Sequence, residues 1–249
     1  MPRRARSETV VPGVPHHVIM RGNNRRNLYS YPSCYRTFLE LLHEATERFE
    51  LPCHGASLMR NHNHLVLTPD SSEQLAGCVH RMAQRYAQRR NRARESTGKL
   101  FEERYIAVPI TTEKQLAATL PYIELNPVRA GIVASADAYR WSTYRLHAGL
   151  PDADPSIAAI WSPHPWWTEL APSLNARAAI YRELTEQRLE AHRTGFVAPL
   201  PRPYTLGVER PDRSRVADHS DEMRTLPPDN RDYGDLDGVV LSPRMAAWR

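Results

Sequence analysis

The fold is decided by a stretch in the first third of the chain, Cys53-His-Gly-Ala-Ser-Leu-Met-Arg-Asn-His-Asn-His-Leu-Val-Leu-Thr68. Residues 53–59 and 62–68 each have the length and the residue types of a β-strand. Only Arg60 and Asn61 separate them, and so short a connection is typical of two strands that pair as a hairpin. This stretch therefore predicts a tight pair of strands.

Further strands and helices alternate on both sides of this hairpin. Residues 14–20 predict a strand, and residues 33–49 predict a helix whose apolar side chains recur at helical spacing. After the hairpin, residues 73–95 predict a second helix, residues 99–110 a strand, and residues 113–126 a helix that Pro127 ends. The order β-α-β-β-α-β-α predicts an α+β fold, with a ferredoxin-like antiparallel sheet and helices packed on one face of it.

Changes in composition and in apolar periodicity divide the 249 residues into three parts. Residues 1–149 carry the predicted sheet and are expected to form the catalytic domain. Residues 150–195 are a C-terminal extension in which Ser173 to His192 predicts one amphipathic helix. Residues 196–249 are rich in proline and charge with little periodicity, which predicts a flexible tail.

Composition narrows the functional classes. The formal net charge is +5 and the basic residues are almost all arginine, the side chain that grips phosphate with two prongs, so a polyanionic partner is plausible. The 3 cysteines have no metal-binding spacing, and no stretch resembles a signal peptide or a membrane span. We expect a cytoplasmic protein without a membrane partner. A phosphate-binding loop is also missing from the sequence, so no nucleotide cofactor is expected.

Two histidines lie two residues apart on the predicted strand 62–68. Side chains at such positions point to the same face of a sheet, so the rings of His62 and His64 are expected to converge. Neutral imidazole is the commonest metal ligand in proteins, and two imidazoles with oxygen ligands suit a divalent metal such as Mg²⁺ or Mn²⁺. The alternative is that both are polar residues on an exposed strand face.

A second constellation is formed by Tyr122 and Asn126, which lie four residues apart and so on one side of a helix. A phenol attacks phosphorus when a nearby cation stabilises its phenolate, because a free phenol is mostly protonated at neutral pH. The alternative makes Tyr122 a half-buried core aromatic and Asn126 a helix-ending residue. Pro121 is awkward inside a helix and predicts a kink or a restart just before Tyr122.

Four motifs, in this order, make the sequence resemble the IS200-like tyrosine transposases, which act on single-stranded DNA and are of the His-hydrophobic-His type. Within them it is most similar to the REP-associated tyrosine transposase group. The resemblance spans roughly residues 12–147. It rests on His17-Val-Ile-Met-Arg-Gly-Asn23, Met59-Arg-Asn-His-Asn-His64, Gly98-Lys-Leu-Phe-Glu-Glu-Arg-Tyr105 and Tyr122-Ile-Glu-Leu-Asn-Pro-Val-Arg-Ala-Gly-Ile-Val133.

The resemblance implies a role for each residue of the two constellations. His62 and His64 would be metal ligands, Asn126 a third ligand through its side-chain oxygen, and Tyr122 the nucleophile. Attack by Tyr122 would leave the enzyme joined to a 5′-phosphate while a 3′-hydroxyl departs, and a second 3′-hydroxyl would reverse the reaction onto a new end. The sequence leaves open whether the chain is a monomer or a homodimer, and whether Tyr122 acts in cis or in trans.

Two basic segments are predicted to contact single-stranded or hairpin DNA. The loop at residues 21–27 combines arginines and asparagines that reach both phosphates and base edges, and the resemblance places it near the substrate. The helix at residues 73–95 has no acidic residue between Gln74 and Arg94. This favours a surface that binds the phosphates of DNA over a surface that is merely solvated. With Arg104 of the third motif, the predicted DNA-binding residues are Arg21, Asn23, Asn24, Arg25, Arg26, Arg81, Arg85, Arg89, Arg92 and Arg104.

Three other functions compete with a transposase. A nicking endonuclease would use the same metal and tyrosine chemistry without moving an element. A DNA-hairpin-binding regulator would have kept the fold and lost catalysis, although all four candidate catalytic residues are present here. A structural zinc protein is a weaker alternative because the cysteines and histidines lack zinc-finger spacing.

Overall fold

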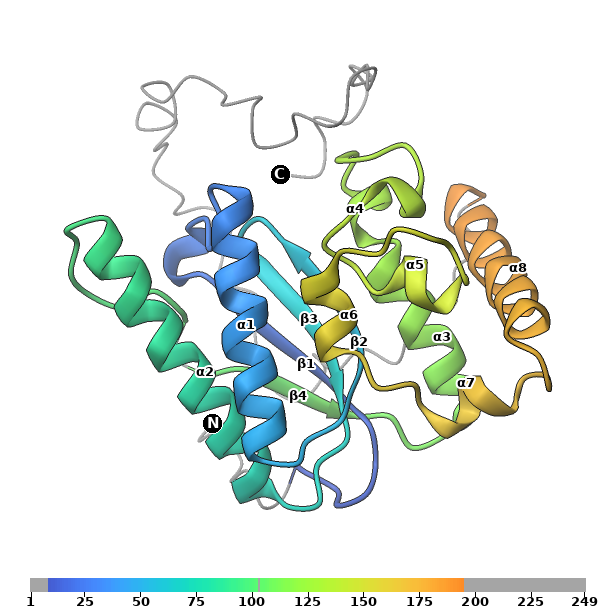
Figure 1. Ribbon diagram of the computed structural model, residues 1–249, viewed down its shortest axis with the longest axis horizontal. Helices are drawn as coiled ribbons and strands as arrows, with labels where there is room; N and C mark the ends of the chain where they lie inside the picture. Colours follow the sequence, from blue (N-terminus) through green and yellow to red (C-terminus); the bar gives the residue numbers. More distant parts are fainter. Residues whose placement is uncertain (1–8, 103, 195–249) are drawn as a thin grey trace.

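The computed structural model describes residues 9–102 and 104–194, and its centre is a four-stranded antiparallel sheet. Figure 1 shows how the strands lie side by side, in the order β2-β3-β1-β4. This order, with the hairpin beside β1 and the last strand at the far edge, confirms the ferredoxin-like α+β fold. The strands are β1 (His16–Arg21), β2 (Cys53–Met59), β3 (His62–Leu67) and β4 (Ile106–Pro109).

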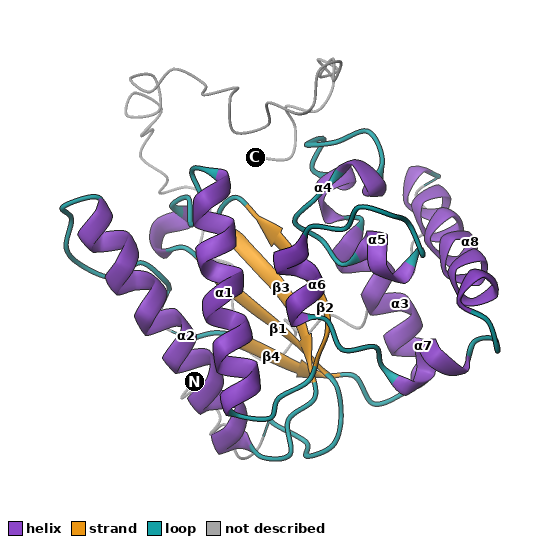
Figure 2. Cartoon of the chain, in the orientation of Figure 1, coloured by secondary structure: helices purple, strands orange, loops and turns teal. Residues whose placement is uncertain are grey.

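Two long helices cover one face of the sheet, α1 (Pro32–Arg48) and α2 (Ser72–Ala93), and they run beside each other in Figure 2. Proline at the first position starts α1. The side chain of Ser71 caps α2 by accepting a hydrogen bond from the backbone N–H of Gln74. Their buried apolar faces form one core cluster with the strand residues that point toward them, such as Val18 and Leu65.

The opposite face of the sheet is covered in part by α3 (Glu113–Glu124), which contacts β2 and β3. A second core cluster forms there from Val66, Leu120 and Ile123. The helix can approach this closely because β2 carries a glycine: a Cβ atom at Gly55 would lie 2.5 Å from Cδ2 of Leu120. The sequence predicted helices on one face only, whereas the structure has helices on both faces.

The C-terminal extension contains more helix than predicted. Instead of a single helix it holds α6 (Pro155–Ile160), α7 (Pro165–Glu169) and α8 (Leu174–Arg193). Helix α6 packs on α1, and α8 packs on α3 (Figure 1). Short proline-started helices such as α6 and α7 lack the apolar periodicity that identifies a helix in the sequence. The predicted tail, residues 196–249, lies outside the described residues.

Several short elements complete the described chain. The strand predicted at residues 99–110 is limited to β4. Helix α3 continues through Pro121, so the helix does not restart at that proline. The helix ends at Glu124, and Leu125 is its C-cap. No helix of the described residues has the length and apolar content needed to cross a membrane. The short elements are η2 (Asn23–Arg25), α4 (Asn126–Arg129), η3 (Ala136–Ala138) and α5 (Tyr144–His147).

Candidate active site

Three histidine rings meet on the sheet face that α3 covers. His62 and His64 share that face of β3, with their ring centroids 4.9 Å apart. The third ring is His17 of β1, which stacks on His64 at a centroid distance of 5.0 Å. His17 pairs with Val66 in the strand register, so it lies diagonally opposite His64. Sequence reasoning gave His17 no role, because its proximity depends on this register.

Hydrogen bonds orient the two rings of β3. Nδ1 of His62 donates to Oδ1 of Asn61 at 2.7 Å, which leaves the Nε2 lone pair of His62 available. Nδ1 of His64 lies 2.8 Å from Nε2 of His17. A His64 ring that donates from Nδ1 keeps its own Nε2 lone pair free. Hydrogen-bonding partners of this kind fix the orientation of metal-binding histidines in proteins.

Burial keeps all three rings neutral. It lowers the pKa of His62 to about 4, with the positive charge of Arg21 adding to the effect. Burial also lowers the pKa of His17 to about 4. The pKa of His64 falls well below its usual value, first because of burial and then because of the neighbouring histidines and arginines. Neutral imidazoles are the form that binds metal.

The remaining ligands of a metal would have to be oxygen atoms. Within residues 9–102 and 104–194, no group of three or more His, Cys, Asp and Glu side chains could hold a metal ion. Asn126 is the first residue of α4 rather than the end of α3, so the helix that was expected to carry both Tyr122 and Asn126 is interrupted between them. Oδ1 of Asn126 accepts a hydrogen bond from Arg129 at 3.4 Å.

Tyr122 faces the histidines from α3 of the same chain. Its half-buried ring has its centroid 6.4 Å from that of His64 and 6.3 Å from that of His17, edge to face in both cases. The guanidinium carbon of Arg129 lies 4.7 Å from the centroid of the phenol ring. A phenol, a pair of neutral imidazoles and a guanidinium therefore lie close together on this face of the sheet.

The loop predicted to bind DNA follows β1 and is close to this point. Arg21 pairs with His62 in the strand register, so it borders the histidine cluster directly. Asn24 and Arg25 have positive φ angles of 52° and 58°, which hold the loop in a tight turn. Four of the five predicted residues of this loop, all except the half-buried Asn23, expose their side chains to solvent.

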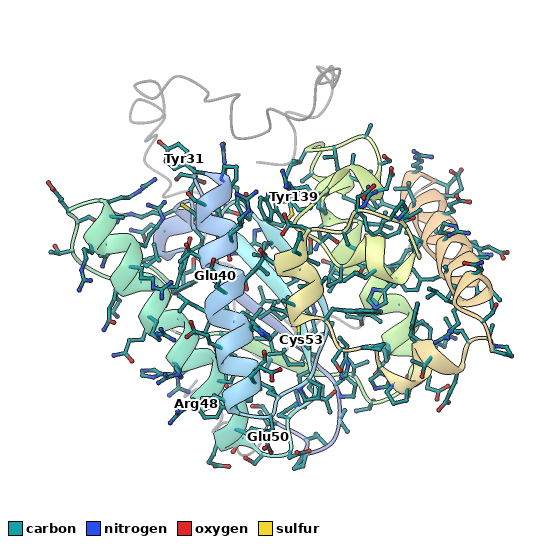
Figure 3. The ribbon with its side chains drawn as sticks, in the orientation of Figure 1. Tyr31, Glu40, Arg48, Glu50, Cys53 and Tyr139 are labelled. Atoms are coloured by element: carbon teal, nitrogen blue, oxygen red, sulfur yellow. The ribbon has the colours of Figure 1, made fainter. Side chains whose placement is uncertain are left out.

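The arginines of α2 do not form a uniform basic surface, because some are paired with acidic residues and others are not. Arg85 forms an ion pair with Glu44 of α1, and Arg89 approaches Glu40 at 3.8 Å, so α1 supplies acidic residues that the sequence of α2 lacks. In Figure 3, Glu40 lies on α1, in the half of the molecule that holds α2. Arg92 is exposed, and Arg81 is half buried.

A further arginine of the same helix, Arg90, serves the fold. It is only 7% exposed, and its Nε donates to the backbone oxygen of Leu28 at 3.1 Å. Arg104 is exposed, and it shares a surface pocket with Arg21 and with Val79 and Ala83 of α2. The pocket joins Arg21 of the basic loop to four residues of the third motif, namely Phe101, Glu102, Arg104 and Tyr105.

The family is decided by the sequence of the sheet and of α3. Residues 10–126 match the family model described as "Transposase IS200 like". These residues form an IS200-like transposase domain. The domain contains all four strands together with His62, His64, Tyr122 and Asn126. The match supports a transposase, a DNA-processing enzyme, and it ends before Arg129 and the C-terminal extension.

A solved structure of another protein shares this fold. A REP-associated tyrosine transposase bound to a REP hairpin superposes with a TM-score of 0.50 at 15% sequence identity, and the match covers 66% of this chain and 92% of that one. A Deinococcus radiodurans protein assigned as a transposase has a TM-score of 0.35 at 18% identity, covering 50% of this chain and 96% of the other. No curated protein sequence matches the chain.

Proposed function

We propose that this transposase acts on single-stranded or hairpin DNA and cleaves and rejoins it through a 5′-phosphotyrosine formed on Tyr122. The observation that carries the proposal is the meeting, within one chain, of the Tyr122 ring with the His62 and His64 pair and with the guanidinium of Arg129. The hairpin bound by the REP-associated tyrosine transposase supports the same class of substrate.

The residues of the site fit a divalent metal. The Nε2 lone pair of His62 is available, and that of His64 is available when its Nδ1 donates to His17. Both rings are neutral, and the amide oxygen of Asn126 lies at the start of α4, directly after the nucleophile's helix. A set of two imidazoles and an amide oxygen leaves positions open for phosphate oxygens, and it suits Mg²⁺ or Mn²⁺. When bound, such an ion supplies Lewis-acid polarisation of a phosphate oxygen.

The protein's own residues perform the strand exchange. Oη of Tyr122 forms a bond to phosphorus while the bond from phosphorus to the 3′ oxygen breaks. The phenol releases one proton and the departing 3′ oxygen takes up one, so no net charge accumulates. Arg129, whose guanidinium lies over the ring of Tyr122, would offset the negative charge that develops on the phenol. Because the phosphotyrosine keeps the bond energy, a second 3′-hydroxyl can reverse the step without a nucleotide cofactor.

DNA would reach this site over the basic loop and the end of α2. We propose that Arg21, Asn23, Asn24, Arg25 and Arg26 hold the strand next to Tyr122, because this loop borders the histidine cluster. Arg92 and Arg104 would extend the contact to phosphates further away, with Arg81, Arg85 and Arg89 alongside. Arg85 and Arg89 must exchange their glutamate partners for phosphate to take part.

The test is a denaturing gel of the full chain incubated with Mn²⁺ and end-labelled single-stranded DNA that contains a palindrome with flanking bases. We expect a covalent protein–DNA adduct with the wild type and with the matched control Tyr31→Phe, whose ring is 53% exposed. The adduct should be lost in Tyr122→Phe and in the presence of a chelator.

Three results would contradict parts of the proposal. An adduct that persists in Tyr122→Phe would assign the nucleophile to another tyrosine. A wild-type protein that binds hairpins and never cuts them would be a hairpin-binding regulator. A protein that cuts and never transfers the 5′-phosphate to a new 3′-hydroxyl would be a nicking endonuclease.

A further inference from the structure

Two guanidinium groups, not one, face the ring of Tyr122. The first belongs to Arg129 of α4, at 4.7 Å from the ring centroid. The second belongs to Arg188 of α8, at 5.9 Å. Arg188 lies near the end of the C-terminal extension, far from Tyr122 in the sequence. It is outside the segment that matches the transposase family. The structure thus brings a residue of the extension to the candidate nucleophile.

The positive charges around Tyr122 are not neutralised by the protein. Within residues 9–102 and 104–194, neither Arg129 nor Arg188 forms an ion pair with a carboxylate, and the buried Nε of Arg129 has no hydrogen-bond partner. Burial lowers the pKa of Arg188, and repulsion by Arg129 lowers it further. One turn further along α8, the pKa of His192 is lowered by burial and then by Arg129. Such a cluster is complementary to an anion.

The helix that carries Arg188 is fixed to the helix that carries Tyr122. Glu124, two residues after Tyr122, is fully buried and accepts a hydrogen bond of 2.6 Å from the phenol of Tyr181 on α8. Tyr181 and Arg188 are seven residues apart, so they lie on the same side of α8 two turns from each other. The contact therefore sets both the rotation and the height of Arg188 relative to Tyr122.

Close packing restrains α8 further. A Cβ atom at Gly149 would lie 2.6 Å from Cβ of Ala178, so the absence of a side chain at residue 149 lets the helix approach. Arg182 donates to the backbone oxygen of Ala148 at 2.6 Å. These contacts hold α8 against the segment around Gly149.

We propose that Arg188 and Arg129 form a two-guanidinium phosphate clamp, in which α8 supplies a phosphate-binding residue to the Tyr122 site. The clamp rests on the proposed function, because it binds the phosphate that Tyr122 attacks. As the bond from Oη to phosphorus forms and the bond to the 3′ oxygen breaks, the two guanidiniums hold the phosphate oxygens and offset the charge of the phenolate.

The test compares Arg188→Ala with Arg193→Ala. Arg193→Ala removes the same charge from the same helix. The side chain of Arg193, however, is 63% exposed and contacts Glu190 instead of the site. In a single-turnover assay with saturating labelled DNA and Mn²⁺, we expect Arg188→Ala to form the covalent adduct at least about tenfold more slowly than wild type. Arg193→Ala should react at the wild-type rate.

A conservative variant separates a role in binding phosphate from a role in packing. Arg188→Lys keeps the charge and the apolar stem but not the two-pronged geometry, so its rate should lie between those of the wild type and Arg188→Ala. Circular dichroism melting checks that each variant is folded. If Arg188→Ala does not fold, Arg188→Lys carries the test. A wild-type rate in the folded Arg188 variant, or equal losses in Arg188→Ala and Arg193→Ala, would overturn the clamp.

A measurement of DNA binding tests the clamp even if the protein does not cleave DNA. If the wild type forms no adduct, the proposed function fails, and the clamp is then decided by binding in the presence of a chelator. With a labelled single-stranded oligonucleotide, Arg188→Ala should reduce the slope of log affinity against log salt concentration by about one, whereas Arg193→Ala should leave it unchanged. An unchanged slope in Arg188→Ala would overturn the clamp.

Discussion

The phenol of Tyr181 donates a hydrogen bond of 2.6 Å to Oε2 of Glu124, and this contact joins α8 to α3. The other oxygen of Glu124 accepts from Thr143 at 2.6 Å and from His147 at 2.8 Å. All four side chains are buried. A single carboxylate thus connects α3, both ends of α5 and the C-terminal extension.

Loss of that contact should destabilise the protein measurably. Tyr181→Phe removes one donor to a buried carboxylate, so we expect the free energy of unfolding to fall by about 1.5–3 kcal/mol in a urea titration. Tyr31→Phe, at an exposed position, should change it by less than about 0.5 kcal/mol. Equal stability of Tyr181→Phe and the wild type would mean that the bond contributes nothing to the docking of α8.

Binding of Mn²⁺ should depend on His17 although His17 is not a proposed ligand. The His17 ring orients His64 through their 2.8 Å hydrogen bond, so His17→Ala should weaken Mn²⁺ affinity by about 10- to 100-fold in calorimetric titrations. His64→Ala should abolish measurable binding, and the exposed control His80→Ala should bind normally. Wild-type affinity in His17→Ala would assign the stacked ring to packing alone.

The close approach of α3 to the sheet predicts a coupling between Gly55 and Leu120. Gly55→Ala places a methyl group 2.5 Å from Cδ2 of Leu120, so it should cost about 1–3 kcal/mol of stability and slow adduct formation by moving Tyr122. Leu120→Ala makes room for that methyl group. The double variant should therefore lose less stability than the two single variants together, and simple additivity would contradict the contact.

The surroundings of the α2 arginines predict unequal roles in DNA binding. Arg92 is exposed and Arg85 is paired with Glu44. In hairpin binding measured against salt concentration, Arg92→Ala should reduce the slope by about one, and Arg85→Ala should reduce it by less because its charge is already partly neutralised. The reverse order would show that Arg85 leaves Glu44 to contact DNA.

Stability should fall in mild acid, and His54 is one of the residues responsible. This ring links β2 to the extension, with Nδ1 2.8 Å from the backbone oxygen of Ser162, and burial lowers its pKa to about 4. The unfolded chain, with a histidine pKa of about 6.5, binds the proton more readily. The stability contributed by His54 is therefore present above pH 6.5 and is lost as the pH falls toward 4.

A variant without the titrating ring checks this assignment. His54→Gln retains hydrogen-bonding capacity, and the dependence of its unfolding free energy on pH should be shallower between pH 6.5 and 4. His80→Gln, at an exposed position, should keep the wild-type slope. Burial also lowers the pKa of His164 and of the site histidines His17, His62 and His64, so part of the slope should remain in His54→Gln. An unchanged slope would exclude His54 as the source.

Local patterns in the sequence were sufficient for the sheet. The hairpin around Arg60 and Asn61 and the alternation of strands and helices depend on neighbouring residues, and these led to the correct ferredoxin-like order. The spacing of His62 and His64 also led correctly to a shared face. The proximity of Tyr122 to these rings could be expected only from the resemblance to IS200-like transposases.

Features that depend on long-range contacts were not predictable. His17 reaches His64 because of the strand register, and Arg90 is buried because its guanidinium bonds a loop backbone sixty-two residues away in sequence. The acidic partners of Arg85 and Arg89 come from α1, which no inspection of α2 alone could reveal. Helix α8 was predicted, but its docking through Glu124 was not, since an internal glutamate gives no sign of its partners.

The position of Arg188 late in the chain has a consequence for how a newly made molecule matures. A ribosome produces His62, His64 and Tyr122 first, and at about 5–20 residues per second it reaches Arg188 only several seconds later. During that interval the nascent polypeptide holds the nucleophile without the α8 guanidinium. If the clamp governs the reaction rate, strand cutting becomes fully active only after translation has passed this helix.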